Sequence, residues 1–276
     1  MTYKALAAIL VFVSHSAFSQ DPNSQPKRPS RKGVVFAYFG WNRAAFTKSD
    51  IHFKGDSYDF TLHHVVAKDR PTPLDPSVYL NPKTMSVPQC NYRVGYFFNN
   101  HYSVSFGFDH MKYVMVKDQV VKISGNIAES NTKYDGQYDN TEIPLSSDFL
   151  RFEHTNGLNY INLELRRMDE IVDLNHFKIN VTEGLGSGIL YPKTDAALLN
   201  FTENDQWHTA GYGISGMVGL QFAIYKYFFI QTEYKAGYIN MPNILTTHYS
   251  ADKADQHFFF SQFTLVLGLQ VGTRRN

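Results

Sequence analysis

The segment at residues 256–272 reads QHFFFSQFTLVLGLQVG. Apolar side chains recur at every second position and alternate with polar or small ones: Phe259, Phe263, Leu265, Leu267, Leu269 and Val271 against Gln262, Thr264, Gly268 and Gln270. A period of two predicts a β-strand with one apolar and one polar face. The segment is also long enough to cross a bilayer as a tilted strand, which takes about 9–11 residues.

The same alternation recurs in segments that begin at residues 102, 212 and 228. A soluble β-sandwich also has an apolar and a polar face. Here, however, Gly, Ser and Ala are frequent on the second face, which fits the crowded interior of a narrow barrel, while the bulky groups fit lipid. We therefore predict an all-β fold, an antiparallel transmembrane β-barrel. The alternation places Phe106, Leu220, Ile230 and Leu267 against lipid, and Ser105, Gln221, Glu233 and Gln270 away from it.

Connection lengths predict about ten strands. Transmembrane barrels have short periplasmic turns and longer extracellular loops, and eight segments obey this rhythm, namely 58–67, 89–98, 101–116, 158–167, 175–185, 210–225, 227–240 and 256–272. The apolar segment 34–41 and a weaker one at 44–53 supply an outward and a return crossing. Eight or twelve strands are the alternatives. Twelve would require residues 112–127 to form a membrane-crossing hairpin, whereas we expect them to extend above the membrane.

The N-terminus predicts export. Residues 1–19 contain Lys4, an apolar run and small residues before Gln20, which are the three parts of a cleavable signal peptide. The apolar run is much shorter than the roughly 20 residues of a transmembrane helix. Residues 20–32, rich in Pro, Ser and Lys, are predicted to form a disordered lead-in. Residues 33–276 would then form a single barrel domain.

Composition narrows the class of protein further. The mean hydropathy of -0.32 is too polar for a bundle of membrane helices. Lys and Arg number 26 against 25 Asp and Glu, so no basic surface for nucleic acid is expected. The 22 Phe and 18 Tyr suit strands and the aromatic girdles of a membrane barrel. Cys90, the single cysteine, has no disulfide partner in the chain and is predicted to be buried.

Together, the signal peptide, the turn rhythm and the alternation resemble uncharacterised outer-membrane β-barrel proteins of Gram-negative bacteria. This resemblance covers nearly the whole chain and implies a location in the bacterial outer membrane and a barrel fold. It implies no reaction.

Six charged residues fall on the non-lipid face of the predicted strands: Arg93, Glu164, Arg166, Lys178, Glu233 and Lys235. Placing Arg or Lys on the lipid face at mid-membrane would cost about 2–4 kcal/mol for each residue. Two interpretations of this lumen polar network are open. The preferred one is a packed lumen of mutually neutralising ion pairs, because small barrels are filled. The other is a polar site inside the barrel for a lipid headgroup or an ion.

One short motif points to lipid chemistry. Residues 152–160 read FEHTNGLNY, which resembles the His-x-Ser-Asn-Gly segment of outer-membrane phospholipase A and the His-x-Ser-Asn segment of lipid A deacylases. In those enzymes His acts as base for a Ser two residues further on. His154 and Gly157 match, but Asn156 stands where the Ser would be, and Thr155 points to the opposite face of a regular strand. The resemblance implies a lipid hydrolase acting through His154, which is the alternative function.

No metal or cofactor site is predicted. Adjacent residues of a strand point to opposite faces, so His63 and His64 cannot share a ligand set, and the other His residues lack metal-binding spacing. Asp135, Asp139 and Glu142 lack the calcium-loop pattern.

The predicted function is therefore a small outer-membrane β-barrel of structural or binding type, preferably without enzymatic activity. Its expected partners are outer-membrane lipid and lipopolysaccharide, and an unidentified ligand or protein at the extracellular loops, of which 117–157 is the longest. A wide diffusion pore is excluded, because channels of that size use about 16–18 strands.

Overall fold

The computed structural model describes residues 30–272, apart from 86, 175, 200 and 202–203. The predicted signal peptide at 1–19 and most of the lead-in at 20–32 lie outside the described residues. At the end of the lead-in, the Arg31 guanidinium donates hydrogen bonds to the side chain of Asn180 (2.6 Å) and to the carbonyl of Met168 (3.2 Å).

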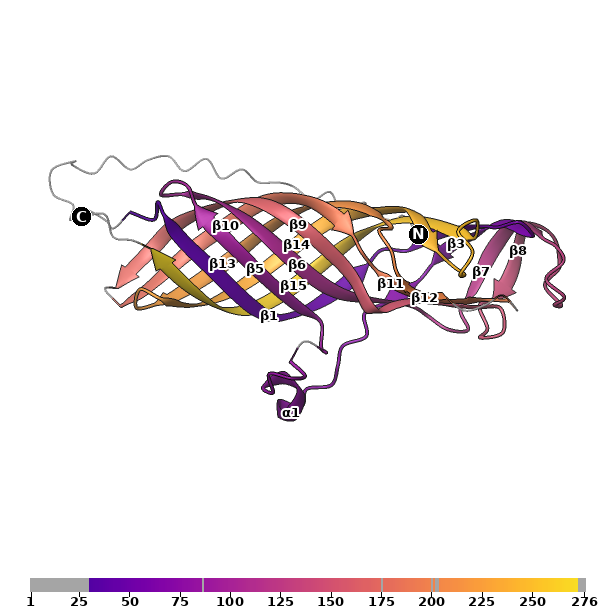
Figure 1. The fold of residues 1–276 in the computed structure, drawn as a ribbon, viewed down its shortest axis with the longest axis horizontal. Helices are drawn as coiled ribbons and strands as arrows, with labels where there is room; N and C mark the ends of the chain where they lie inside the picture. Colours follow the sequence, from indigo (N-terminus) through magenta and orange to yellow (C-terminus); the bar gives the residue numbers. More distant parts are fainter. Residues whose placement is uncertain (1–29, 86, 175, 200, 202–203, 273–276) are drawn as a thin grey trace, which may run out of the picture.

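The core of the architecture is a closed antiparallel ring of eight long strands (Figure 1). In order around the ring they are β1 (Val34–Phe46), β5 (Cys90–Phe97), β6 (Tyr102–Met115), β9 (Leu150–Leu174), β10 (Phe177–Leu190), β13 (Gly211–Ile224), β14 (Phe228–Leu245) and β15 (Lys253–Gly272). The sheet closes because β1 pairs with β5 along one edge and with β15 along the other. The prediction of an all-β antiparallel barrel is confirmed.

The remaining strands lie beyond one end of the ring, in a part that we call the extension: β2 (Ser49–Lys54), β3 (Tyr58–Val65), β4 (Ala67–Lys68), β7 (Val120–Ile127), β8 (Gly136–Pro144), β11 (Lys193–Leu198) and β12 (Asn204–Trp207). There β2 pairs with residues 253–256 of β15, and β3, β7 and β8 follow in order. Separately, β11 pairs with β9 and with β12. The only helix in the described part of the chain, α1 (Pro76–Tyr79), stands off the side of the barrel (Figure 1).

The preferred count of ten strands is wrong. The described residues form fifteen strands, of which eight close the ring. Of the two segments expected as added crossings, 34–41 lies in the ring strand β1, whereas 44–53 lies partly in β1 and partly in β2. Segment 58–67, one of the eight strands of the predicted rhythm, lies mainly in β3, outside the ring, where β2 and β3 pair with each other and with β15 and β7. Residues 112–127 lie at the top of β6 and in β7, within the extension, as expected.

The exposed surface of the ring is an apolar belt. On β15 the belt runs through residues 263–271, close to the roughly 9–11 residues that a membrane-crossing strand needs. The predicted alternation is confirmed for seven of the eight residues: Phe106, Leu220, Ile230 and Leu267 are exposed, whereas Ser105, Gln221 and Glu233 are buried inside. Gln270, near the end of β15, is half-buried. No helix in the described part of the chain is long and apolar enough to cross a membrane.

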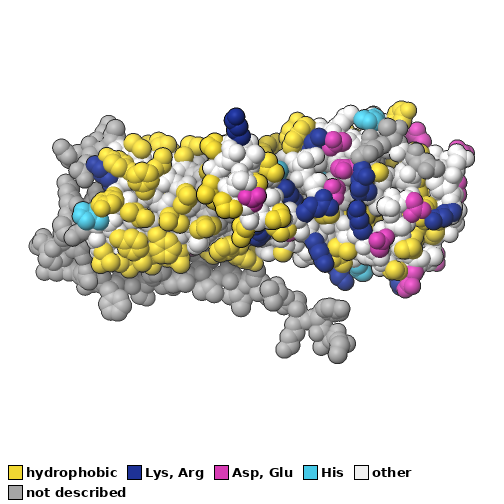
Figure 2. Space-filling view, turned by 90° about the horizontal axis from the view of Figure 1, so that it is seen from below, with side chains coloured by type: hydrophobic (Ala, Val, Ile, Leu, Met, Phe, Trp, Pro, Cys, Tyr) yellow, Lys and Arg dark blue, Asp and Glu magenta, His cyan; other side chains and the backbone are white. Residues whose placement is uncertain are grey.

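The polarity of the barrel reverses at the level where the extension begins. Along the inward face of β6, Ser105 and Asp109 give way to Met111, Tyr113 and Met115, all fully or almost fully buried. Inward apolar residues from the neighbouring strands join them in one large core that fills the extension. The outer surface changes in the opposite sense: on the face shown in Figure 2, apolar side chains predominate along one half and charged ones along the other. A surface of this kind meets lipid along the ring and water along the extension.

Two strands of the ring approach closely at Gly268. A Cβ at this residue would lie 2.1 Å from the ring of Phe229 on β14, so the aromatic ring occupies the place of the missing side chain. Glycine is required here by the packing of an inward-facing aromatic, a recognised means of stabilising strand glycines.

Candidate functional site

The lumen holds a network of buried ion pairs centred on Arg166. This residue, on β9, contacts Glu233 of β14 at 2.7 Å and Glu164 of its own strand at 2.6 Å. Their side chains point inward because they share the parity of the small residues that face the lumen. None of the three side chains is more than 4% exposed.

A second group of pairs lies beside the first. Arg93 of β5 contacts Glu164 at 2.9 Å and Asp109 of β6 at 3.8 Å, and Lys235 of β14 contacts Glu164 at 2.8 Å and also pairs with Asp109. The structure therefore brings together five of the six residues predicted for the lumen polar network. It adds Asp109, whose inward parity was evident from the alternation of residues 102–109.

Neutral side chains satisfy the remaining hydrogen-bonding groups of the network. Tyr38 donates to Glu233 (3.0 Å) and accepts from Arg93 (3.0 Å) and Arg166 (2.9 Å). Asn162 accepts from Arg93 (2.7 Å) and donates to Asp109 (3.1 Å). The six charged side chains thus form three cations and three anions, each in contact with opposite charge, and they fill the lumen with balanced charge.

Lys178 does not join this network, which corrects the prediction for that residue. It lies near the start of β10, where its ammonium group contacts Glu170 at 2.8 Å and Asp173 at 2.6 Å. These pairs lie at the end of the ring away from the extension, and the Lys178 side chain is 23% exposed. The alternation correctly predicted that Lys178 faces away from lipid. It carries no information on how far along the barrel axis the residue lies.

His154 lies in the core of the extension. Its side chain is fully buried between the rings of Tyr113 and Phe152, and its Nδ1 lies 3.0 Å from the hydroxyl of Thr194 on β11. The Nε2 atom is buried without a hydrogen-bond partner. This part of β9 stands outside the membrane-spanning ring, and burial lowers the pKa of His154 to about 3, so the imidazole is neutral.

The other two residues of the motif point elsewhere. Thr155 donates a hydrogen bond to Glu153 (2.9 Å), which also pairs with Arg70 at 3.1 Å, and Asn156 is exposed. The adjacent Gly157 has a φ of 128°, a conformation that favours glycine, beside an irregular pairing of β6 with β9. Because solvent and lipid cannot reach His154, the geometry does not assemble a base and a nucleophile at the barrel rim.

Three other histidines, His52, His63 and His64, pair with carboxylates on the outer surface of the extension. His52 on β2 lies 2.7 Å from Asp59 on β3 and 2.8 Å from Asp255 on β15. His63 and His64 both contact Asp50, at 3.2 and 3.6 Å. No group of three or more His, Cys, Asp or Glu residues with metal-binding geometry occurs among the described residues.

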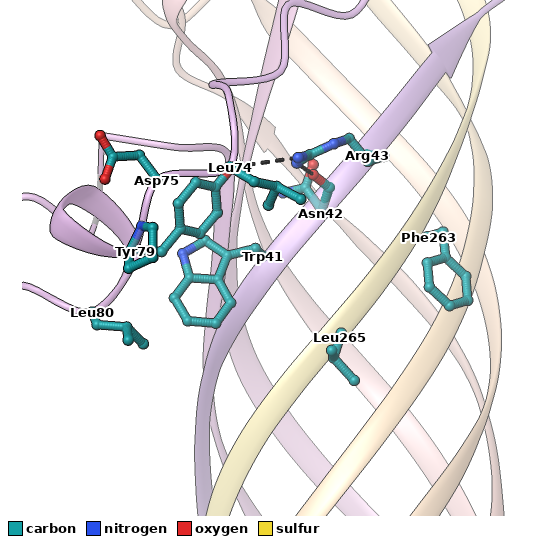
Figure 3. A pocket seen from close by; sticks show the side chains of 10 residues that line it. Trp41, Asn42, Arg43, Leu74, Asp75, Tyr79, Leu80, Phe263 and Leu265 are labelled. Carbon is teal, nitrogen blue, oxygen red and sulfur yellow. Dashed lines mark hydrogen bonds between the residues drawn. The ribbon is translucent and has the colours of Figure 1, made fainter.

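One feature of the barrel wall was not foreseen from the sequence. The connection between β4 and β5 was read only as a Pro-rich loop, but it folds back so that α1 lies beside the outer surface of β1 and β15. The groove between them, which we call the α1 groove, has a volume of about 490 Å³ (Figure 3). Trp41, at the end of the apolar belt on β1, contacts Tyr79 of α1. A large aromatic at this position is the one feature of the sequence that could have indicated a contact with another segment.

The closed ring, the apolar belt and the filled polar lumen define this chain as a transmembrane β-barrel of the outer-membrane type. Solved structures with a similar course of the chain include Ail, the attachment invasion locus protein of Yersinia pestis. It is 12% identical, the match covers 87% of this chain and 99% of that one, and the TM-score is 0.33.

The outer-membrane protein OprG from Pseudomonas aeruginosa is also 12% identical, with 89% of this chain and 99% of that one covered and a TM-score of 0.42. The outer-membrane protein AlkL is 10% identical, with 94% and 99% covered and a TM-score of 0.40. No protein-family model matches the sequence, and no curated protein matches it. The class of the fold therefore rests on the strand pairing and the polarity of the barrel itself.

Proposed function

We propose that this protein is a binding or structural protein of the outer membrane, in which the ring is an anchor and the extension is the part presented at the cell surface. The observation that carries the proposal is the reversal of polarity along continuous strands. It gives the extension its own apolar core and a water-compatible surface without breaking the sheet that fixes it to the ring.

The filled lumen supports an anchoring role for the ring. Six charged side chains, none more than 4% exposed, occupy the interior and neutralise one another. Moving an ion or a solute through this region would require breaking several buried charge contacts, each of which is costly to leave unpaired. The observed positions favour the packed-lumen interpretation over an internal ligand site.

The lengths of the connections support this orientation. The turns at residues 98–101 and 225–227 are short and lie at the end of the ring away from the extension, as periplasmic turns do. The extension surface carries both signs of charge, for example Lys54, Asp59 and Lys122, so we propose a polar protein or saccharide partner rather than a polyanion.

Surface labelling tests the orientation. Cys90 is buried, so a Cys introduced at Lys122 in the extension or at Lys226 in a short turn would be the reactive thiol. On intact cells, we expect a membrane-impermeant maleimide to label K122C and not K226C, and both after lysis. Labelling of K226C alone on intact cells would reverse the orientation and refute the proposal.

Two activity measurements test the anchoring role. We expect no stepwise conductance in planar bilayers and no release of fatty acid from phospholipid or lipopolysaccharide micelles. Hydrolysis that is lost in His154→Ala would instead support the lipid hydrolase alternative. Binding to arrays of glycans and surface proteins should be weakened by the double variant K54S/K122S, which changes only exposed positions of the extension.

A further inference from the structure

The α1 groove lies on the outside of the barrel and is continuous with the apolar belt. One wall is formed by Phe263 and Leu265 of β15, which are 54% and 46% exposed and belong to the belt. The other wall is formed by Leu74 and Leu80, which flank α1 and are 84% and 76% exposed (Figure 3). Leucines this exposed are unfavourable in water and favourable in lipid.

Specific contacts hold α1 and its flanking residues beside the barrel, so the groove has a defined shape. The Trp41 ring lies 5.4 Å from the Tyr79 ring of α1, and its indole nitrogen donates to the carbonyl of Met85 (3.2 Å). The Tyr79 hydroxyl donates to the carbonyl of Thr72 (2.9 Å). Trp41 therefore fastens the segment to β1 at Tyr79 and Met85, and the Tyr79–Thr72 hydrogen bond braces the segment internally. The volume of about 490 Å³ lies within the roughly 300–1,000 Å³ of ligand pockets.

A cation stands at the edge of the groove. Arg43 pairs with Phe263 in the register of β1 and β15, and it lies on the outward face, just past the last apolar residue of the belt on β1. Its guanidinium donates to the Asn42 carbonyl (2.8 Å) and to the Tyr79 hydroxyl (3.3 Å). No carboxylate among the described residues lies within ion-pair distance of it. Two of its five N–H donors are thus used, which leaves others for a ligand. The Asp69 carboxylate, which accepts a hydrogen bond from the backbone N–H of Ala44 (3.0 Å), interacts electrostatically with Arg43 from beyond ion-pair distance, and Asp75 also lines the groove.

We infer that the α1 groove binds a membrane lipid, with one acyl chain between α1 and the β1–β15 wall and an anionic phosphate headgroup at Arg43. The apolar walls match a hydrocarbon chain, and the belt supplies the route by which a chain enters from the bilayer. Arginine suits the headgroup because its planar guanidinium binds phosphate oxygens with charge-assisted hydrogen bonds. The inference requires only that the ring crosses a bilayer and is independent of what the extension binds.

The protein contains a built-in probe for this site. It has two tryptophans, Trp41 in the groove and Trp207 in the extension, where Trp207 stacks on Tyr191. Full-length W207F protein is therefore reconstituted in phosphatidylcholine vesicles, and its Trp41 emission is measured as lipid with brominated acyl chains is added, either phosphatidylglycerol or phosphatidylcholine. Bromine quenches tryptophan fluorescence on close contact, so quenching reports an acyl chain in the groove.

We expect brominated phosphatidylglycerol to reach half-maximal quenching at an about fivefold lower mole fraction than brominated phosphatidylcholine, the factor expected from one basic residue at a membrane surface. Arg43→Gln should abolish this preference. Arg167 lies on β9 at the opposite end of the ring, where it pairs with Tyr102 in the strand register and contacts Asp169 at 2.7 Å. Arg167→Gln removes the same charge there and should keep the preference. The double variant L74S/L80S should reduce quenching by both lipids, and an unboiled gel shift verifies that each variant is folded.

Equal quenching by both lipids in the W207F protein would overturn the inference, because ordinary annular lipid would then explain the contact. Loss of the preference in both R43Q and R167Q would also overturn it, because the effect would belong to surface charge in general. Unchanged quenching in L74S/L80S would show that α1 does not form a wall of the site and would overturn the inference as well.

Discussion

Arg166 is the residue on which the buried charge contacts of the lumen converge. It touches Glu164, Glu233 and Tyr38, so its removal leaves two buried carboxylates without their nearest cation. We expect Arg166→Ala to lower the free energy of unfolding by about 3–5 kcal/mol. Urea unfolding followed by the mobility of unboiled samples measures this loss.

The control for Arg166→Ala is Lys178→Ala. Its ion pairs are partly exposed, and such pairs contribute about 0–1 kcal/mol. The double variant R166L/E233L removes one cation and one anion and should be more stable than R166A. Equal losses in R166A and K178A would contradict the role assigned to the lumen network.

His52 makes the stability of the extension depend on pH. Partial burial lowers its pKa, but the hydrogen bonds with Asp59 and Asp255 outweigh burial and raise the pKa above its usual value of about 6.5. The contribution of protonated His52 is therefore complete below about pH 6.5 and is lost as the pH rises through the higher pKa of the folded state. We expect limited proteolysis of the extension to be slower at pH 6 than at pH 8.5, a difference that His52→Gln should reduce. The same difference in H52Q as in the wild type would show that other groups cause it.

The strands β14 and β15 depend on the fit between Phe229 and Gly268. Gly268→Val would place side-chain atoms where the Phe229 ring lies, so we expect little folded protein in an unboiled gel. Phe229→Ala alone should cost about 3–5 kcal/mol of stability, as for a large-to-small change in a core. The double variant F229A/G268V should recover part of the folded fraction lost in G268V. If it folds no better than G268V, the ring is not the cause of the clash.

Element boundaries show what the sequence could and could not predict. The alternation in β6, β13, β14 and β15 predicted their inward and outward faces correctly, because a period of two fixes parity. It could not separate β2 and β3 from membrane strands, because both kinds alternate. Charge at the polar positions does not separate them either: Asp50 and Asp59 of β2 and β3 are charged, but so are Glu164, Arg166, Glu233 and Lys235 of the ring strands β9 and β14.

The candidate site shows the same limit. Parity assigned Arg93, Glu164, Arg166, Glu233 and Lys235 to the interior, but their contacts depend on strand stagger, which no local pattern encodes. Beyond the hint given by Trp41, no local pattern predicts the α1 groove, since it arises where a loop folds back on strands far away in the sequence.

For the whole molecule, the reversal of polarity predicts how deeply the protein sits in a bilayer. Two outward-facing positions of β15 lie on either side of the reversal, Leu267 on the belt and His257 in the extension. Spin labels on Cys at these positions, with Cys90 replaced by Ser, should be relaxed mainly by oxygen at residue 267 and mainly by a water-soluble nickel complex at residue 257. Relaxation by oxygen at both positions would place the extension inside the membrane and refute the two-part description.

The balance of three cations against three anions in the lumen also constrains the evolutionary history of the protein. A single charge-changing substitution at these positions leaves an excess of one buried charge, which we expect to be strongly destabilising. We therefore expect replacements to occur in pairs, such as loss of a cation together with an anion that it contacts. In relatives, we expect these lumen positions to change together although their strands are distant in sequence. Such covariation would identify related chains even where their surface residues no longer match.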